Sequence, residues 1–259
     1  MDYKSIIISS PPRTGSMWTQ NVVREIFKSQ KINITPQKII KNEDDALKCH
    51  FESINSNKNN LISVIKVEKL IEKKDAKNTK IIINFRDPRD AVVSYKIFMK
   101  HRKLDFKDLL DLIKKFISWI EYYRKNYEKE QYLEISFKDI IEQPFKIFNQ
   151  LESFLNLRID KKITDEIVNK FAKNQVLKII KKNDDYVRKS FANKKHINEE
   201  NMIIEENKII RAYDVDTGFQ TGHISNSKDG EWDHVFSAKE INVINSTFKD
   251  WLTKNNLKN

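Results

Sequence analysis

Two short segments of this chain combine cationic and hydroxyl side chains in a spacing that suits the binding of anions. The first is Pro12–Trp18 (PRTGSMW), which follows the apolar run Ile6–Ile8 and precedes a helical pattern. A loop that leads into a helix gathers free backbone N–H groups and the positive end of the helix dipole, so it favours an anion. Arg13 adds a positive charge, Gly15 lets the backbone approach a ligand oxygen, and Ser16 offers a hydroxyl.

The second segment follows another apolar run, Lys80–Phe85, whose composition is typical of a strand buried on both faces. Arg86 stands at the end of this run, Asp87 is a good helix N-cap, and Pro88 suits the first helical position. Ser94 lies two helical turns beyond Arg86. Open α/β sheets bind ligands at the carboxyl ends of their parallel strands. Two anion sites at that edge predict a ligand with two separate phosphate-like groups.

Both segments resemble parts of the sulfotransferases that use 3′-phosphoadenosine 5′-phosphosulfate (PAPS). Pro12–Trp18 looks like the family's Pro-Lys-Ser-Gly-Thr-Thr-Trp loop, and Arg86 and Ser94 look like the Arg and Ser of its 3′-phosphate segment. Gly230–Ser237 (GEWDHVFS) is similar to the C-terminal Gly-Asp-Trp-Lys-Asn-x-Phe-Thr stretch. Leu133–Ile140 (LEISFKDI) resembles the Tyr-Glu-Asp-Leu strand end. The four matches fall in the family's order and span nearly the whole chain.

The resemblance implies a reaction and a set of binding residues. The loop would hold the 5′-phosphosulfate, and Arg13 would stabilise the leaving phosphate in place of the family's lysine. The residues expected to bind PAPS are Arg13, Thr14, Gly15, Ser16, Met17, Trp18, Arg86, Ser94, Phe137, Ser225, Asn226, Ser227 and Lys228. A sulfuryl group would move from PAPS to a hydroxyl or amine by in-line displacement, leaving adenosine 3′,5′-bisphosphate. PAPS is the one cofactor expected, as a co-substrate, and no metal is needed.

Three segments depart from the family's pattern. Arg13 replaces the loop lysine, and Phe137 replaces an aromatic residue that can hydrogen-bond. The C-terminal motif normally opens with Arg-Lys-Gly, whereas this chain has Ser225–Ser227 there. Lys228 is the remaining candidate for a cationic contact with the 3′-phosphate. We therefore expect weaker binding of that phosphate than is usual in the family.

The general base is expected after the strand Leu61–Ile65, where cytosolic members of the family have a Lys-Thr-His stretch. This chain has Lys66, Val67 and Glu68 in that order, so Glu68 takes the place of the histidine. A glutamate with an ordinary pKa near 4.3 is ionised at neutral pH and can accept a proton. The alternatives are that Glu68 is a surface residue paired with neighbouring lysines, or that His50 is the base.

Composition sets the broad class of the protein. The chain has 259 residues, a formal net charge of +11 and one cysteine, Cys49, so it cannot form an internal disulfide. It shows no signal-peptide pattern, and no apolar run approaches the roughly 18 residues of a membrane span. We expect one α/β domain over residues 1–259, in a cytoplasmic protein. Its acceptor could be a small molecule, a glycan or a lipid, and its oligomeric state is open.

The sequence gives less support to other functions. A P-loop kinase needs a Gly-x-x-x-x-Gly-Lys-Ser/Thr loop, whereas Gly15 is the one glycine in this loop and no lysine stands between Gly15 and Ser16. A non-catalytic binder of nucleotide or nucleic acid, on a degenerate sulfotransferase fold, fits the positive charge, but no nucleic-acid recognition motif is present. The histidines are scattered without metal-ligand spacing, so no metal site is expected.

Apolar periodicity predicts alternating strands and helices, hence a mostly parallel central sheet flanked by helices, with a P-loop-like loop after the first strand. The expected strands cover residues 4–9, 61–65, 80–85 and 131–135. The expected helices cover residues 16–30, 89–100, 106–127 and 145–155, with a terminal helix that starts at a capping box, Ser237–Glu240. Residues 31–60 suggest no element, and residues 156–217 suggest helices plus a mobile segment over the site.

Overall fold

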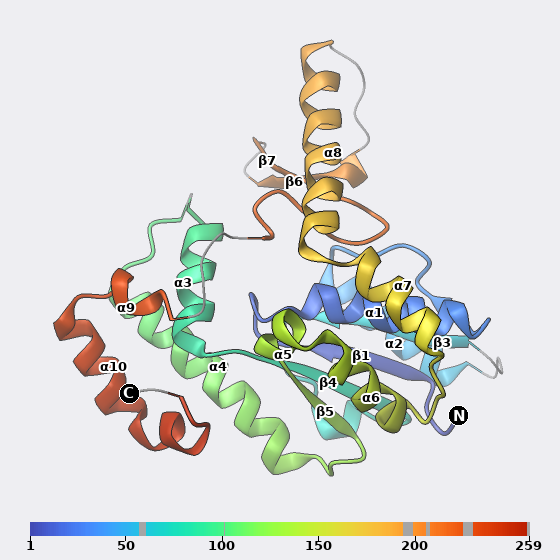
Figure 1. Ribbon diagram of the computed structural model, residues 1–259, viewed down its shortest axis with the longest axis horizontal. Helices are drawn as coiled ribbons and strands as arrows, with labels where there is room; N and C mark the ends of the chain where they lie inside the picture. Colours follow the sequence, from blue (N-terminus) through green and yellow to red (C-terminus); the bar gives the residue numbers. More distant parts are fainter. Residues whose placement is uncertain (57–60, 101, 194–198, 206–207, 225–229, 258–259) are drawn as a thin grey trace.

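Five parallel strands form the centre of the molecule, in the order β2-β3-β1-β4-β5 (Figure 1). The computed structural model describes residues 1–56, 61–100, 102–193, 199–205, 208–224 and 230–257. The strands of this sheet are β1 (Ser5–Ser9), β2 (Asn33–Thr35), β3 (Leu61–Val67), β4 (Thr79–Phe85) and β5 (Tyr132–Ser136). The order reverses at β1, because β3 pairs on one side of it and β4 on the other. Such a reversal is where open α/β sheets bind ligands.

Helices cover both faces of this sheet. The first ones along the chain are α1 (Ser16–Ser29), α2 (Glu43–Asn55), α3 (Pro88–Phe98), α4 (Phe106–Asn126), α5 (Phe137–Glu142) and α6 (Pro144–Leu155). They are followed by α7 (Lys161–Lys170), α8 (Lys173–Ala192), α9 (Trp232–Val235) and α10 (Ala238–Lys254). Two single turns, η1 (Lys73–Asp75) and η2 (Glu199–Asn201), lie in the connections.

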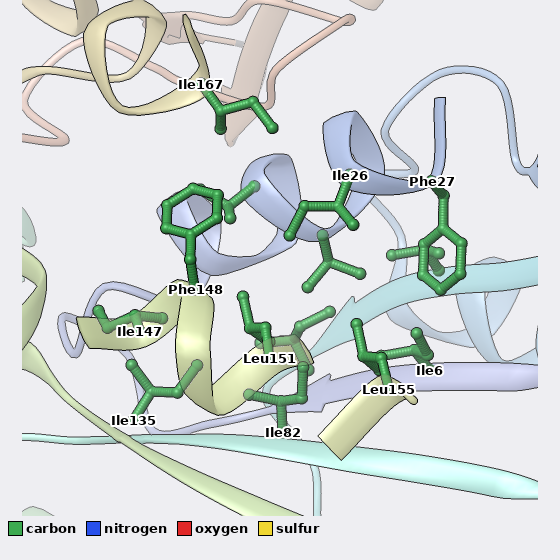
Figure 2. Packing of buried hydrophobic residues seen from close by; sticks show 14 of the residues in the cluster. Ile6, Ile26, Phe27, Ile82, Ile135, Ile147, Phe148, Leu151, Leu155 and Ile167 are labelled. Atoms are coloured by element: carbon green, nitrogen blue, oxygen red, sulfur yellow. The ribbon is translucent and has the colours of Figure 1, made fainter. Parts of the chain in front are cut away.

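The alternation of side chains along each strand separates two apolar layers. On one face, Ile6 and Ile82 pack under α1 and α6, and Figure 2 shows Ile26 and Phe148 closing over them. On the other face, Ile7 packs with residues of α2 and α4. Most of these strand residues are fully buried, which explains why the sequence shows continuous apolar runs rather than alternation.

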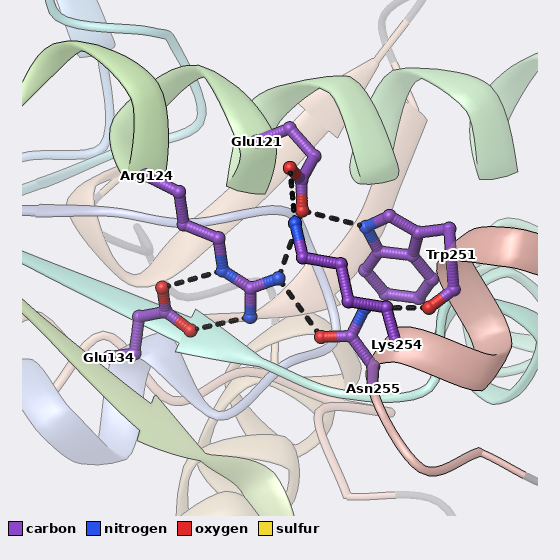
Figure 3. Close-up of polar contacts among 6 residues, drawn as sticks. All are labelled: Glu121, Arg124, Glu134, Trp251, Lys254 and Asn255. Carbon is purple, nitrogen blue, oxygen red and sulfur yellow. Dashed lines mark hydrogen bonds and ion pairs between the residues drawn. The ribbon is translucent and has the colours of Figure 1, made fainter.

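A polar network fastens the C-terminal helix to the edge of the sheet (Figure 3). Arg124 of α4 donates two hydrogen bonds of 2.8 Å to the carboxylate of Glu134 on β5. The same guanidinium contacts Glu121 and the side-chain oxygen of Asn255, both at 2.9 Å. Glu121 in turn accepts a hydrogen bond from the indole of Trp251. The fork geometry of Arg124 therefore joins α4, β5 and the end of α10.

A second, smaller unit of structure lies beside the sheet. The strands β6 (Met202–Glu205) and β7 (Lys208–Ala212) form an antiparallel pair that packs against α8. Figure 1 shows α8 extending away from the central sheet, with this pair at its side. The loop after β7 returns toward the sheet and carries residues of the candidate site.

The expected fold class is confirmed, and the expected strands and helices are present with shifts of a residue or two at their ends. Two regions hold more regular structure than the sequence indicates. Residues 31–60 contain β2 and α2, and residues 156–217 contain α7, α8 and the β6–β7 pair. Helix α2 buries only Ala46, His50 and Ser53, so it lacks the apolar stripe that marks an amphipathic helix.

Candidate functional site

The candidate site lies at the carboxyl edge of the sheet, in the loops that follow β1, β3, β4 and β5. The loop after β1 leads into α1 through two left-handed residues, Arg13 with φ of 68° and Gly15 with φ of 92°. Left-handed residues turn successive backbone N–H groups toward one side, which forms a concave anion site. The Thr14 hydroxyl donates to the carbonyl of Pro11 at 2.7 Å and so fixes the turn.

Gly15 is also the N-cap of α1 and supplies no capping side chain. The N–H groups of the first turn of α1, which begins at Ser16, therefore have no capping side chain, an arrangement that favours an anion. Ser16 itself is buried, and Met17 and Trp18 pack partly against the apolar layer beneath α1. Of the loop residues predicted from the sequence, Thr14, Met17 and Trp18 thus have packing or hydrogen-bonding partners within the protein.

The start of α3 provides the second cation and a hydroxyl. Asp87 caps this helix by accepting from the Arg89 N–H at 2.9 Å, as expected from the sequence. Arg86 is 7% exposed, and its guanidinium carbon lies 4.3 Å from the ring centroid of Phe137. Phe137 thus acts as a cation–π platform for Arg86. The predicted residues of the β4 and β5 segments therefore do come together.

The two predicted anion sites meet through Arg13. Its Nε donates to the Ser94 hydroxyl at 3.0 Å, across 81 positions of the sequence. Burial, together with the positive charges of Arg86 and Arg211, lowers the pKa of Arg13 to about 10, although the carboxylate of Glu68 acts in the opposite direction. Arg13 remains a cation at neutral pH, because this pKa lies well above 7. The site thus gathers several cations in a partly dry setting, where the attraction between opposite charges is stronger than in bulk water.

Glu68 follows β3 and faces the same cluster. Its carboxylate accepts from the Lys66 ammonium at 2.9 Å, and its side chain is 38% exposed. Its backbone N–H donates to the carboxylate of Glu43, at the start of α2, at 2.6 Å. Glu68 contributes to the electrostatic environment of Arg13, which places the two groups in one neighbourhood. The carboxylate of Glu68 therefore remains accessible to a ligand.

His50 lies elsewhere. It is fully buried, with Nδ1 at 2.8 Å from the Ser5 hydroxyl and Nε2 at 3.1 Å from the carbonyl of Asp75. Ser5 is the first residue of β1, so His50 sits at the opposite edge of the sheet from Arg13. Both ring nitrogens are occupied, which removes His50 from the candidates for a general base.

Comparisons with known proteins identify this arrangement. A family model described as the sulfotransferase domain matches residues 3–256. The chain belongs to the sulfotransferase family. Among solved structures, mouse sulfotransferase SULT7A1 complexed with PAP is 15% identical, with a TM-score of 0.64 over 97% of this chain and 84% of that one.

Retinol dehydratase has the same fold. Its complex with androsterone and the inactive cofactor PAP is 14% identical, with a TM-score of 0.61 over 99% of this chain and 82% of that one. Its complex with retinol and PAP is 13% identical, with a TM-score of 0.59 over 99% of this chain and 83% of that one. No curated protein matches the chain. None of the described helices is long and apolar enough to cross a membrane.

The C-terminal match of this sulfotransferase family member is anchored to the start of α3. Trp232 lies under Arg89, with the guanidinium carbon 3.9 Å from the ring centroid, and the Gly230 N–H donates to Asp90 at 2.9 Å. The motif therefore reaches the segment that carries Arg86 and Ser94. The other predicted residues of this motif, Ser225, Asn226, Ser227 and Lys228, lie outside the described residues.

Three residues near Arg13 were not among the predicted binding residues. Phe98, at the end of α3, has the Arg13 guanidinium at 4.7 Å and the Arg211 guanidinium at 3.8 Å from its ring centroid. Arg211, on β7, also donates to the carbonyl of Phe98 at 2.8 Å. His223 stacks on the same ring. No local motif marks Phe98 or Arg211, whereas the closeness of His223 to the C-terminal motif was a usable signal.

Proposed function

We propose that this chain is an enzyme that transfers the sulfuryl group of PAPS to a hydroxyl or amine of an acceptor. The observation that supports this most strongly is the meeting of two anion sites at one sheet edge. The loop at Arg13–Ser16 would receive the 5′-phosphosulfate, and Arg86 with Ser94 would receive the 3′-phosphate. The hydrogen bond from Arg13 to Ser94 supports this assignment, because it brings residues of both proposed subsites together.

In the proposed reaction, Glu68 accepts the proton of the acceptor hydroxyl while the acceptor oxygen forms a bond to sulfur. The bond between sulfur and the bridging oxygen breaks, and its electron pair stays on the phosphate of adenosine 3′,5′-bisphosphate. Arg13 stabilises the charge that develops on this oxygen. The loop and Arg86 hold the nucleotide in line, so the chain's contribution is positioning and electrostatics.

The acceptor is proposed to be a small molecule. The retinol dehydratase complexes contain androsterone or retinol together with PAP, which makes hydroxylated lipophilic compounds a first test set. Glycans and larger lipids form the second set. A chain that binds the nucleotide but transfers sulfuryl to none of them would instead be a non-catalytic nucleotide binder.

Calorimetric titration with adenosine 3′,5′-bisphosphate and with AMP tests the nucleotide assignment. We expect tighter binding of the bisphosphate, because AMP leaves the Arg86–Ser94 subsite empty. Arg86→Ala should weaken bisphosphate binding by about 1.5–3 kcal/mol, the usual scale for a hydrogen bond to a charged group, and should affect AMP less. The control is Arg188→Ala, which removes an exposed arginine paired with Asp184 on α8. Equal affinities for both nucleotides would refute the assignment.

A further inference from the structure

His223 stands beside Arg13 although nothing in the loop motif includes it. The Arg13 guanidinium donates to the carbonyl of Gly222 at 3.4 Å, directly before His223 in the chain. The imidazole stacks on Phe98 with centroids 6.1 Å apart and an interplanar angle of 26°, and it meets Phe219 edge-on at 5.9 Å. Two aromatic rings and the loop backbone therefore hold the imidazole in one orientation next to the cation.

The hydrogen bonds of His223 define its tautomer. The backbone N–H of Gln220 donates to Nδ1 at 3.2 Å, so Nδ1 is an acceptor and the neutral ring carries its proton on Nε2. Nε2 has no hydrogen-bond partner among the residues that the structure describes. It also differs from the unpartnered polar atoms that are closed off from solvent, such as Oε1 of Gln220, because it is not fully buried. This N–H donor therefore faces accessible space at the site.

The charged groups that act on His223 are all cations. Burial lowers its pKa well below 6.5, and the positive charges of Arg13 in the loop, Lys66 on β3 and Arg211 on β7 lower it further. The carboxylate of Glu68, whose charge acts on Arg13, is itself paired with Lys66. An unpartnered N–H donor among three cations suits an oxyanion and suits neither a cation nor an apolar group.

We propose that the Nε2–H of His223 donates a hydrogen bond to an oxyanion of the bound nucleotide, beside Arg13. This assignment rests on the proposed function, which supplies the nucleotide as the ligand. It adds a donor from the loop after β7 to those of the loop after β1. The same contact has a second consequence. An anion next to the ring offsets the field of the three cations, so binding raises the pKa of His223. The proton would add to Nδ1, which then no longer accepts from the Gln220 N–H.

Calorimetry with adenosine 3′,5′-bisphosphate near pH 6, in three buffers of different ionisation enthalpy, measures the protons taken up on binding. His223→Gln retains a side-chain N–H donor and cannot be protonated, whereas His223→Phe retains the aromatic stack and has no donor. We expect the wild-type protein to take up more protons than His223→Gln, by a fraction of a proton up to about one. Proton release from the nucleotide's own phosphate occurs with each protein and cancels in this difference.

Affinity gives the second readout. His223→Phe should bind the bisphosphate about tenfold or more weakly, the fold-change that corresponds to a lost charged hydrogen bond, and His223→Gln should recover part of that loss. The control is His234→Gln on α9, since the side chain of His234 is 83% exposed and lies outside the cluster. It should match the wild type in both readouts.

The outcomes separate the two hypotheses. If the wild-type protein does not bind the bisphosphate, the proposed function fails. If it binds, but His223→Phe binds the bisphosphate as tightly as the wild type does, the nucleotide contact of His223 is refuted and its ring only packs. If His223→Phe does not fold, His223→Leu, which also lacks a side-chain donor, takes its place in the affinity comparison.

Discussion

Replacing Gly15 by alanine should destabilise the protein for two reasons that the structure separates. Gly15 has φ of 92°, where an alanine costs about 1–2 kcal/mol because its Cβ approaches the following carbonyl. That Cβ would also lie 2.6 Å from Cδ1 of Ile140 and 3.2 Å from Cδ2 of Phe137. Forcing an extra carbon into a packed contact adds about 1–3 kcal/mol. Gly15→Ala should therefore lower the free energy of unfolding by about 2–5 kcal/mol.

Gly230 provides a matched control, because it has the same φ of 92° and no atom of the described residues lies within 4 Å of the Cβ that alanine would add. Gly230→Ala should lose only the conformational part, about 1–2 kcal/mol. Urea denaturation with both variants at equal m-values measures the difference. Ile140→Val removes the Cδ1 atom, so Gly15→Ala should cost at least about 1 kcal/mol less in that background. If Gly15→Ala and Gly230→Ala agree within about 0.5 kcal/mol, the packing argument is wrong.

Four further predictions address the reaction and the stability. Steady-state kinetics should show that Arg13→Ala lowers kcat about a hundredfold or more, while Arg13→Lys keeps substantial activity; a change in KM alone would make Arg13 an anchor. Ser94→Ala removes the partner of the Arg13 Nε and should weaken bisphosphate binding about tenfold in calorimetry. Glu68→Gln should lower kcat about a hundredfold or more with any acceptor found, and near-normal turnover would exclude Glu68 as the base. Burial lowers the pKa of His50 below 6.5, so on acidification the unfolded chain takes up a proton at His50 before the folded protein does. The free energy of unfolding should therefore fall as the pH drops through 6.5 toward the lowered pKa. His50→Gln should flatten this slope in denaturant titrations.

The sequence predicts the centre of the fold well because its strands are apolar on both faces and its helices carry local signals. Asp87 and Ser237 each mark a helix start that the structure has, through hydrogen bonds between residues two or three positions apart. The same locality explains the agreement for Arg86 and Phe137, since each directly follows a strand at the common edge of the sheet.

What the sequence cannot predict depends on contacts between distant segments. Arg211 reaches the carbonyl of Phe98 across 113 positions, and neither residue belongs to a motif. The β6–β7 pair is short and its sequence has no turn signature. The return of the loop after β7 to the central sheet therefore follows only from tertiary packing. His50 illustrates the converse error, because a histidine in a polar region looks available until its two buried hydrogen bonds are known.

The left-handed backbone of Arg13 sets stability against activity at a single position. The described residues other than glycine with positive φ are Arg13, Lys31, Asn78, Asn156 and Asn256. Asparagine tolerates this conformation, whereas arginine there costs about 1–2 kcal/mol of a total stability of about 5–15 kcal/mol. A laboratory selection for thermal stability alone should therefore enrich glycine or asparagine at this position, and each such survivor would lack the cation. Directed evolution of this chain needs a screen that scores turnover and stability together.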